Sequence, residues 1–388
     1  MPGAGDDMVM PPPLAHSVSL PDSYSGPAVK QAAVEIRRTI GRPAAVAVAF
    51  VSSDYLPFYR DFVETLRVDG HILDVIGCTA LGRIAGDCET ESGKGCVVLA
   101  LAADTPEPHE AHVRGLFSLP AGSPRPHSAL LLANPEQFET DAWLREWNAT
   151  FPGAPCLGGL ASAEEGAQMA VFLNDRIVDA VCLPLSRRAA LLPILSQGCR
   201  PIGEPLTVTR AEDNIVYSLG GQPAYKALET AFDSLTDSEK SVAKGNLFAG
   251  LAGNEYVDDF KPGDFLIRSI IGADPGSGAV VIGGIPRTGQ TLQYQLRNRE
   301  IARADLARVL SPADLSGTRP IATLLFSCID RGAGFFGEPH FDASNFFRAT
   351  GGRPLAGFFC NGGIGPVGGR SALHGHSAAA GIWVEKSL

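Results

Sequence analysis

The chain has 388 residues, of which 45% are hydrophobic and 19% charged, with a formal net charge of −10. This balance is typical of a globular protein with room for two domains, and it excludes an intrinsically disordered chain. The acidic charge argues against a nucleic-acid partner. No apolar run approaches the roughly 20 residues of a membrane span. Asp6 and Asp7 stand where a secretory signal would be basic, so we expect a cytoplasmic protein.

Residues 1–24 contain three consecutive prolines and no periodicity, which predicts a flexible Pro-rich leader. Apolar residues then recur every three or four positions in Pro27–Ile40, which predicts a helix. The run Ala44–Val51 has the length of a buried strand, and an aromatic-rich helix follows it. Further elements of the first half are strands at Gly95–Ala102, Ser128–Ala133, Met169–Leu173, Asp179–Leu185 and Leu191–Leu195, and a helix at Glu136–Trp147.

Glycine and proline cluster at Ser196–Pro205, where we place a domain boundary. The second half is predicted to contain helices at Pro223–Phe232, Glu300–Leu310 and Phe341–Ala349, and strands at Phe265–Ile271, Ala279–Gly283, Thr291–Leu296, Ile321–Cys328, Leu355–Phe359 and Ser377–Glu385. We therefore predict an α+β fold with two mixed αβ domains, at residues 25–200 and 201–388. Their sheets are covered by helices or packed sheet on sheet.

None of the eight cysteines shows C-x-x-C spacing, which argues against a zinc ribbon or a thioredoxin motif. Several lie in apolar runs, where reduced thiols behave as small hydrophobic groups. We therefore expect buried, reduced cysteines.

Four stretches of the sequence resemble the FIST family, in the family's order. They are Gly77–Gly82 (GCTALG), Ser196–Gly203 (SQGCRPIG), Phe326–Gly332 (FSCIDRG) and Leu355–Pro366 (LAGFFCNGGIGP). The resemblance implies a standalone sensory module of bacterial type, FIST N-like over 25–200 and FIST C-like over 201–388. Such a module binds a small ligand and signals through a partner protein. Gly363 stands where the family pattern carries a glutamate, so a carboxylate for a cationic ligand group is absent there.

The third stretch places Cys328 and Arg331 at the end of a buried strand, with Gly332 opening the loop. Ligands of open sheets commonly bind beyond strand ends. The guanidinium group can bind a ligand carboxylate or phosphate through two parallel hydrogen bonds, or lower the pKa of the thiol. The structural alternative is that Cys328 fills the core and Arg331 forms an ion pair.

The fourth stretch contains Asn361, Gly362 and Gly363 in a turn that either faces a ligand or is purely structural. Its match to a dinucleotide fingerprint is discounted, because Pro366 interrupts it and no helix follows. We expect this turn and the end of the Cys328 strand to converge on one cleft.

Four further residues complete the candidate ligand site. Cys78 and Thr79 are expected at a strand-end turn that faces the cleft, and Gly158–Gly159 are expected in a similar turn. Arg268 is a charge in an apolar strand and pairs with a ligand acid if it points inward. His374 and His376 are two residues apart and suit either a metal ion or plain loop hydrogen bonds.

The sequence thus predicts a binding module for a small polar metabolite, such as an amino acid or a derivative. Three alternatives stay open. A haem-binding gas sensor would take its axial ligand from the histidines, without a c-type attachment signature. A cysteine-dependent enzyme would use Cys328 or Cys360 as nucleophile and His340 or His374 as base. A ligand-free scaffold would expose a large apolar patch.

Overall fold

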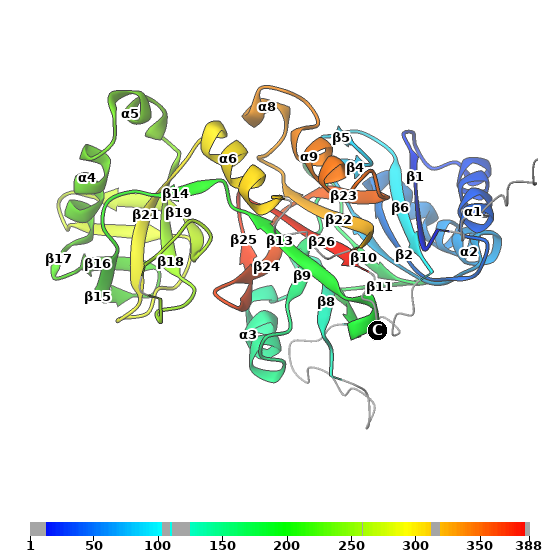
Figure 1. Cartoon of the computed structure of the whole chain (residues 1–388), viewed down its shortest axis with the longest axis horizontal. Coiled ribbons are helices and arrows are strands. Elements are labelled where there is room, and N and C mark those ends of the chain that lie inside the picture. The colour runs from blue at the N-terminus through cyan, green and yellow to red at the C-terminus, as the bar shows by residue number, and fades with distance from the viewer. Residues whose placement is uncertain (1–12, 103–108, 111–124, 258, 312–318, 385–388) are drawn as a thin grey trace, which may run out of the picture.

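The computed structural model describes residues 13–102, 109–110, 125–257, 259–311 and 319–384. Three six-stranded sheets of these residues form a body, and a separate barrel lies at one end of it (Figure 1). The α+β class predicted from the sequence is confirmed.

Sheet A is centred on the parallel pair β2–β3, whose connection carries η1 and α2. Antiparallel β6 pairs with β2, and β1 forms the outer strand. The prediction of a flexible leader at residues 1–24 is wrong where Ala15–Leu20 form strand β1. Residues 1–12 of that segment lie outside the described part. The elements are β1 (Ala15–Leu20), α1 (Gly26–Ile40), β2 (Ala44–Val51), η1 (Ser53–Phe58), α2 (Tyr59–Gly70), β3 (Ile72–Thr79), β4 (Arg83–Ala85), β5 (Cys88–Thr90) and β6 (Cys96–Leu101).

Sheet C repeats this arrangement with the parallel pair β8–β9, antiparallel β12 and outer strand β7. Here α3 connects the parallel strands. The predicted turn at Gly158–Gly159 is wrong, because both residues lie inside β9 and pair with β8. The elements are β7 (His109–Glu110), β8 (Ser128–Ala133), α3 (Thr140–Thr150), β9 (Cys156–Leu160), β10 (Val171–Leu173), β11 (Arg176–Val178) and β12 (Ala180–Leu185), followed by η2 (Arg187–Ala189).

Sheet B is the third copy, with the parallel pair β22–β23, antiparallel β26 and outer strand β13. The elements are β13 (Leu191–Ser196), α6 (Arg299–Val309), β22 (Pro320–Cys328), α8 (Ala333–Phe336), α9 (Phe341–Ala349), β23 (Leu355–Cys360), β24 (Gly363–Val367), β25 (Arg370–His374) and β26 (Ala378–Val384).

In each of the three units, the hairpin that follows the second parallel strand pairs with a strand of a neighbouring sheet. Hairpin β4–β5 pairs with β23, β10–β11 with β3, and β24–β25 with β9. The three copies are thereby linked in a cycle, which gives the body a pseudo-threefold topology. Strands from both sides of residue 200 share sheets B and C, so the two predicted halves are interleaved.

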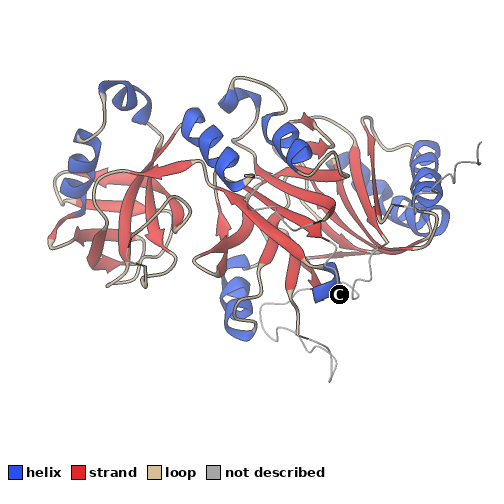
Figure 2. Cartoon of the chain, viewed as in Figure 1, coloured by secondary structure: helices blue, strands red, loops and turns tan. Residues whose placement is uncertain are grey.

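One hydrophobic core lies between the three sheets, and it is formed by the inward faces of all of them. The rings of Phe50, Phe326 and Phe358 meet there, with centroid separations of 4.6–6.2 Å. The outer faces pack against α1 and α2 on sheet A, α3 on sheet C, and α6 and α9 on sheet B. Figure 2 shows these helices around the strands. Sheet packing and helix cover are therefore both present.

The chain leaves sheet B after β13 and builds the barrel before it returns at α6. Strands β21, β15, β16, β20, β19 and β18 pair in order, and β18 closes the ring on β21. The elements are β14 (Cys199–Pro201), β15 (Leu206–Glu212), β16 (Ile215–Leu219), β17 (Gln222–Pro223), α4 (Ala224–Asp233), α5 (Asp237–Ala243), β18 (Leu247–Ala252), β19 (Phe265–Asp274), β20 (Ala279–Ile282) and β21 (Thr291–Arg297). A capping box between Thr236 and Glu239 starts α5.

Candidate functional site

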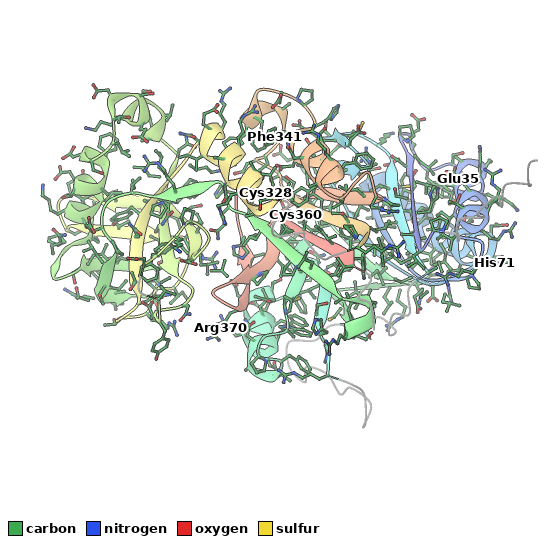
Figure 3. The ribbon with its side chains drawn as sticks, in the orientation of Figure 1. Glu35, His71, Cys328, Phe341, Cys360 and Arg370 are labelled. Carbon is green, nitrogen blue, oxygen red and sulfur yellow. The ribbon has the colours of Figure 1, made fainter. Side chains whose placement is uncertain are left out.

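The ends of β22 and β23 lie side by side, because Cys328 and Cys360 are register partners in a parallel pair. The amide of Ile329 also donates to the carbonyl of Cys360 at 3.2 Å. Figure 3 shows both cysteines close together, on the side of the body nearer the barrel. The two glycine-bordered stretches therefore converge in space.

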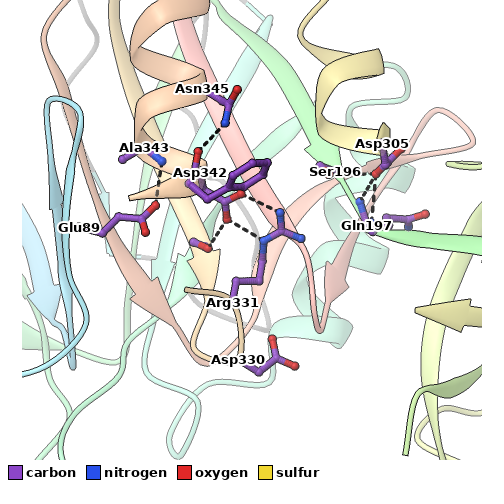
Figure 4. A network of polar contacts seen from close by, with 12 residues as sticks. Glu89, Ser196, Gln197, Asp305, Asp330, Arg331, Asp342, Ala343 and Asn345 are labelled. Atoms are coloured by element: carbon purple, nitrogen blue, oxygen red, sulfur yellow. Dashed lines mark hydrogen bonds and ion pairs between the residues drawn. The ribbon is translucent and has the colours of Figure 1, made fainter. Parts of the chain in front are cut away.

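Arg331 turns from this strand end into the protein and meets the carboxylate of Asp342, at the start of α9. Its Nε and Nη2 donate to Asp342 at 2.7 and 2.8 Å, and its side chain is 0% exposed. Ser327 donates to the same carboxylate at 2.9 Å. Only Nη1 lacks a partner. Figure 4 shows this network, with the carboxylate of Asp330 apart from it. The two parallel hydrogen bonds that the Arg331 guanidinium could offer a ligand anion are therefore made to Asp342.

The glycine-rich stretch and the β3 end form the junction between the three sheets. Asn361 is exposed and donates to the carbonyl of Ala161 at 2.9 Å. The carbonyl of Thr79 accepts from Ser162, and that of Gly362 accepts from Leu160. These bonds hold the three strand ends against one another.

Three other candidates are buried or closely packed. Cys78 is fully buried, and burial raises the pKa of its thiol well above the usual value. Gly363 lies inside β24 and pairs with Gly159. A Cβ on Gly332, whose φ is 125°, would come within 2.8 Å of the carboxylate of Glu91.

His374 is buried, and its Nε2 hydrogen-bonds the carbonyl of Gly365 at 3.0 Å. Burial lowers the pKa of its imidazole to about 4, so this side chain is neutral at pH 7. In the described part of the chain, no three His, Cys, Asp or Glu side chains are placed to hold a metal ion.

Asp330 and His376 form a dyad between the end of β22 and the start of β26. His376 Nδ1 donates to Asp330 Oδ2, and Arg297 Nη2 lies 3.5 Å from Oδ1 of the same carboxylate. Burial pushes the pKa of Asp330 upwards, but the His376 hydrogen bond and the Arg297 charge outweigh it and bring the pKa to about 2. The carboxylate is therefore ionised and fixes the imidazole orientation, with Nε2 on the side of the ring away from Asp330, near Ser269.

The Cys328 thiol contacts Asp330 and the main chain of His376. Burial and the charge of Asp330 raise the pKa of this thiol to about 11, so it is neutral at pH 7. His340 Nδ1 accepts from the amide of Glu89 at 2.9 Å. These contacts do not activate Cys328 as a nucleophile, because the thiolate is the reactive form.

His376 lines a cavity of about 390 Å³ at the end of the barrel, which we call the barrel cavity. Its Nε2 lies 3.4 Å from Ser269 Oγ, and its ring packs on Phe248 at 4.6 Å. The lining residues are Leu228, Phe232, Lys240, Ala243, Lys244, Gly245, Leu247, Phe248, Ser269, Ile270 and His376.

The backbone of His376 is left-handed, with φ of 59°. Non-glycine residues rarely adopt this conformation, and those that do cluster at functional sites. An oriented imidazole on a strained backbone beside an apolar cavity is an arrangement suited to binding a ligand.

The sequence of the FIST N domain matches residues 45–222, and that of the FIST C domain matches residues 224–366. An uncharacterized protein of Mycobacterium tuberculosis is 34% identical over 370 residues, covering 92% of this chain and 96% of its own. An uncharacterized protein of Mycobacterium bovis is 32% identical over 380 residues, covering 92% of this chain and 97% of its own. The chain belongs to the FIST family. FIST domains are sensory modules that bind small ligands.

In this FIST protein the sequence interpretation missed the Asp330–His376 dyad. Asp330 stands inside the third family stretch, and the sequence interpretation of His376 is a metal ligand beside His374 or a loop residue making plain hydrogen bonds. An acidic residue two positions after a buried strand is the available signal. The partner could not be inferred, because 46 positions separate the two residues.

Arg268 lies on β19 and is half-buried. Its Nη1 donates to the carbonyl of Leu373 at 2.9 Å, and its side chain lines a second cavity between the barrel and hairpin β24–β25. Among the described residues, no helix is both long and apolar enough to cross a membrane.

The buried carboxyl group of Glu89 should make the free energy of unfolding depend on pH. Burial raises the pKa of this carboxyl to about 7 from 4.5, although the amide of Ala343 donates to it at 2.8 Å. Its contribution to stability is full below pH 4.5 and is lost as the pH rises through 7. We therefore expect Glu89→Gln to gain stability over wild type by on the order of 2 kcal/mol between pH 4.5 and 8.

Urea denaturation at a series of pH values measures this difference. The matched control is Glu64→Gln, which makes the same substitution on the exposed face of α2. A flat profile for Glu89→Gln would contradict the assignment.

Proposed function

We propose that this FIST protein senses a small carboxylic acid with an apolar body, such as an N-acylated amino acid, in the barrel cavity. The observation that carries the proposal is the His376 imidazole, which Asp330 fixes at one wall of an apolar cavity. A receptor site needs this combination of an apolar surface and a few oriented polar groups.

The lining residues decide the chemistry of the ligand. Leu228, Phe232, Leu247, Phe248 and Ile270 provide an apolar wall. Lys240 and Lys244 provide positive charge, while no carboxylate belongs to the lining. A ligand carboxylate would be stabilised here, whereas the ammonium group of a free amino acid would meet only cations and dipoles. An amino acid whose amine is acylated avoids this penalty.

Position 363 supports the same class of ligand. A Cβ at Gly363 would lie 3.2 Å from the Cβ of Ala379, so a glutamate there would need the neighbouring strand to shift by a few tenths of an ångström. With Gly363 in place of a glutamate, this position offers no carboxylate to a cationic ligand group.

Signalling through a partner protein fits the position of the cavity. Its walls come from the barrel and from His376, which belongs to the segment before β26 of the body. A ligand that contacts both would favour one orientation of the barrel relative to the body, and such rigid-body shifts are a common output of ligand binding.

A thermal-shift screen with N-acetylphenylalanine, N-acetylleucine and the two free amino acids tests the proposal. A ligand at a hundred times its Kd adds about 2.7 kcal/mol to the free energy of unfolding. We expect the N-acetyl compounds to raise the Tm more than the free amino acids do. The double variant K240Q/K244Q should lose most of this shift, while Lys261→Gln, an exposed barrel lysine outside the cavity, should keep it. No shift with any acid, or an equal shift in K240Q/K244Q, would contradict the proposal.

The same dyad supports haem as a second candidate ligand. His376, oriented by the bond from its Nδ1 to Asp330, would hold the iron, and Lys240 and Lys244 would pair with the propionates. Haem would supply an iron that binds diatomic gases. A Soret band that appears on adding haemin to the wild type, but not to His376→Ala, would favour haem over the organic acid.

A further inference from the structure

The second cavity has a volume of about 590 Å³ and lies between α3, the barrel and hairpin β24–β25. We call it the arginine cavity, because four arginines line it. The lining residues are Asp141, Leu144, Arg145, Asn148, Leu251, Ala252, Gly253, Leu266, Arg268, Gly283, Gly284, Ile285, Arg287, Gln290, Val367, Arg370, Ser371 and Ala372. We propose that this cavity binds a multiply charged oxyanion, a phosphate ester or a polycarboxylate.

Charge is the first argument. The lining holds the guanidinium groups of Arg145, Arg268, Arg287 and Arg370 and the single carboxylate of Asp141. None of the ion pairs among the described residues involves any of the four arginines. Like charges gathered around one concave space repel one another, and a bound anion relieves this repulsion.

The position of Arg268 is the second argument. Its guanidinium hydrogen-bonds only the main-chain carbonyls of Ile267 and Leu373, and no carboxylate. The carboxylate of Asp141, on the opposite wall, attracts this guanidinium without forming an ion pair with it. A half-buried guanidinium with no carboxylate in contact is stabilised by a ligand that supplies one. A Cβ on Gly284 would come within 2.8 Å of Arg268 Nε, so glycine at 284 makes room for this side chain.

The walls of the cavity are fixed before any ligand binds. The side-chain amide of Asn148 on α3 makes two 2.8 Å hydrogen bonds to the main chain of Ser371. The amide of Gln290 donates to the carbonyl of Ala252 at 3.1 Å. Figure 3 shows Arg370 on the side of its hairpin that faces the barrel. The arginines therefore converge from separate but firmly connected elements.

The four arginines around the arginine cavity favour a ligand with more than one negative charge. A singly charged anion would leave most of the positive charge uncompensated, whereas a di- or trianion can pair with several guanidinium groups at once. The site is distinct from the barrel cavity, although strand β19 serves both. Leu266 and Arg268 line the arginine cavity, and Ser269 and Ile270 line the barrel cavity.

Isothermal titration calorimetry with inorganic pyrophosphate and with citrate, at low salt, tests the proposal on the full chain. We expect binding to weaken about tenfold in Arg287→Gln and in Arg370→Gln, because each removes one charge-assisted contact. Both side chains are exposed, so these variants should fold normally. Arg38→Gln on α1 removes the same charge from an exposed position far along the chain and should bind like the wild type.

The two probes separate the sources of the anion. Tighter pyrophosphate binding assigns a phosphate ester, and tighter citrate binding assigns a polycarboxylate. Undetectable binding of both, or an equal loss in Arg38→Gln, overturns the proposal. The variant K240Q/K244Q should bind the preferred probe normally, so failure of the sensing proposal at the barrel cavity is distinguishable from failure here.

Discussion

Replacing Asp342 with alanine is expected to lower the free energy of unfolding by about 3–5 kcal/mol. The substitution leaves the Arg331 guanidinium, 0% exposed, without a counter-ion. It also removes the acceptor of the Ser327 hydroxyl. An unpaired buried charge costs far more than the pair contributes, so this effect should be among the largest single-residue losses in the body.

Urea denaturation with matched variants checks this expectation. Glu338→Ala removes the partner of Arg303 in an exposed ion pair and should cost no more than about 1 kcal/mol. The double variant R331M/D342L replaces both charges by apolar groups and should be clearly more stable than Asp342→Ala. If Asp342→Ala costs no more than Glu338→Ala, the buried pair does not hold the β22 end to α9.

The Arg331–Asp342 pair also shows why the sequence alone could not decide the role of Arg331. An arginine after a buried strand and before a glycine is compatible with an anion site or with an internal ion pair. The deciding partner, Asp342, is eleven positions away at the start of another helix. Nothing in the spacing shows that α9 begins against the end of β22, because tertiary packing places it there.

Local elements were predictable where one periodicity dominates. Ala44–Val51, Ser128–Ala133 and Phe341–Ala349 have the predicted bounds. In contrast, β1 was missed because Ala15–Leu20 lies in a short segment with weak alternation beside a proline-rich stretch. Its pairing with β6, some eighty positions away, supplies the hydrogen bonds that the local sequence does not predict.

The hairpin exchange could not be predicted by local reasoning. Each hairpin follows the second parallel strand of its own unit in the chain but pairs with a strand of another. The closed barrel is a similar case, since β18 and β21 meet across a ring of antiparallel strands. The barrel cavity depends on tertiary pairing too, because Phe248 of β18 and Ser269 of β19 are register partners that both contact His376 of the body.

One sequence signal of the threefold arrangement was nonetheless present. Gly77, Gly158 and Gly357 occupy equivalent positions in the second parallel strand of each unit. A Cβ on each would meet the carbonyl oxygen of its partner strand, at 2.1, 1.8 and 2.1 Å respectively. The same steric demand thus recurs three times, although the residues around it differ.

Gly158→Ala is expected to cost more than about 4 kcal/mol or to abolish soluble expression. The new Cβ would lie 1.8 Å from the carbonyl oxygen of Leu131, and φ at this position is 152°. Because the paired oxygen is main chain inside a sheet, it cannot move without breaking the β8–β9 pairing. Gly77→Ala and Gly357→Ala should be destabilised in the same direction if the three positions are equivalent.

Two control variants separate the contact from the backbone strain. Gly153 has φ of 83° but nothing within 4 Å of the added Cβ, so Gly153→Ala should show strain alone, about 1 kcal/mol. Gly272 has open space and no positive φ, so Gly272→Ala should be near neutral. Soluble yield and urea midpoints of these variants measure the effect. A Gly158→Ala protein as stable as Gly153→Ala would mean that the close strand approach does not require glycine, and the structural equivalence of the three units would lose its steric basis.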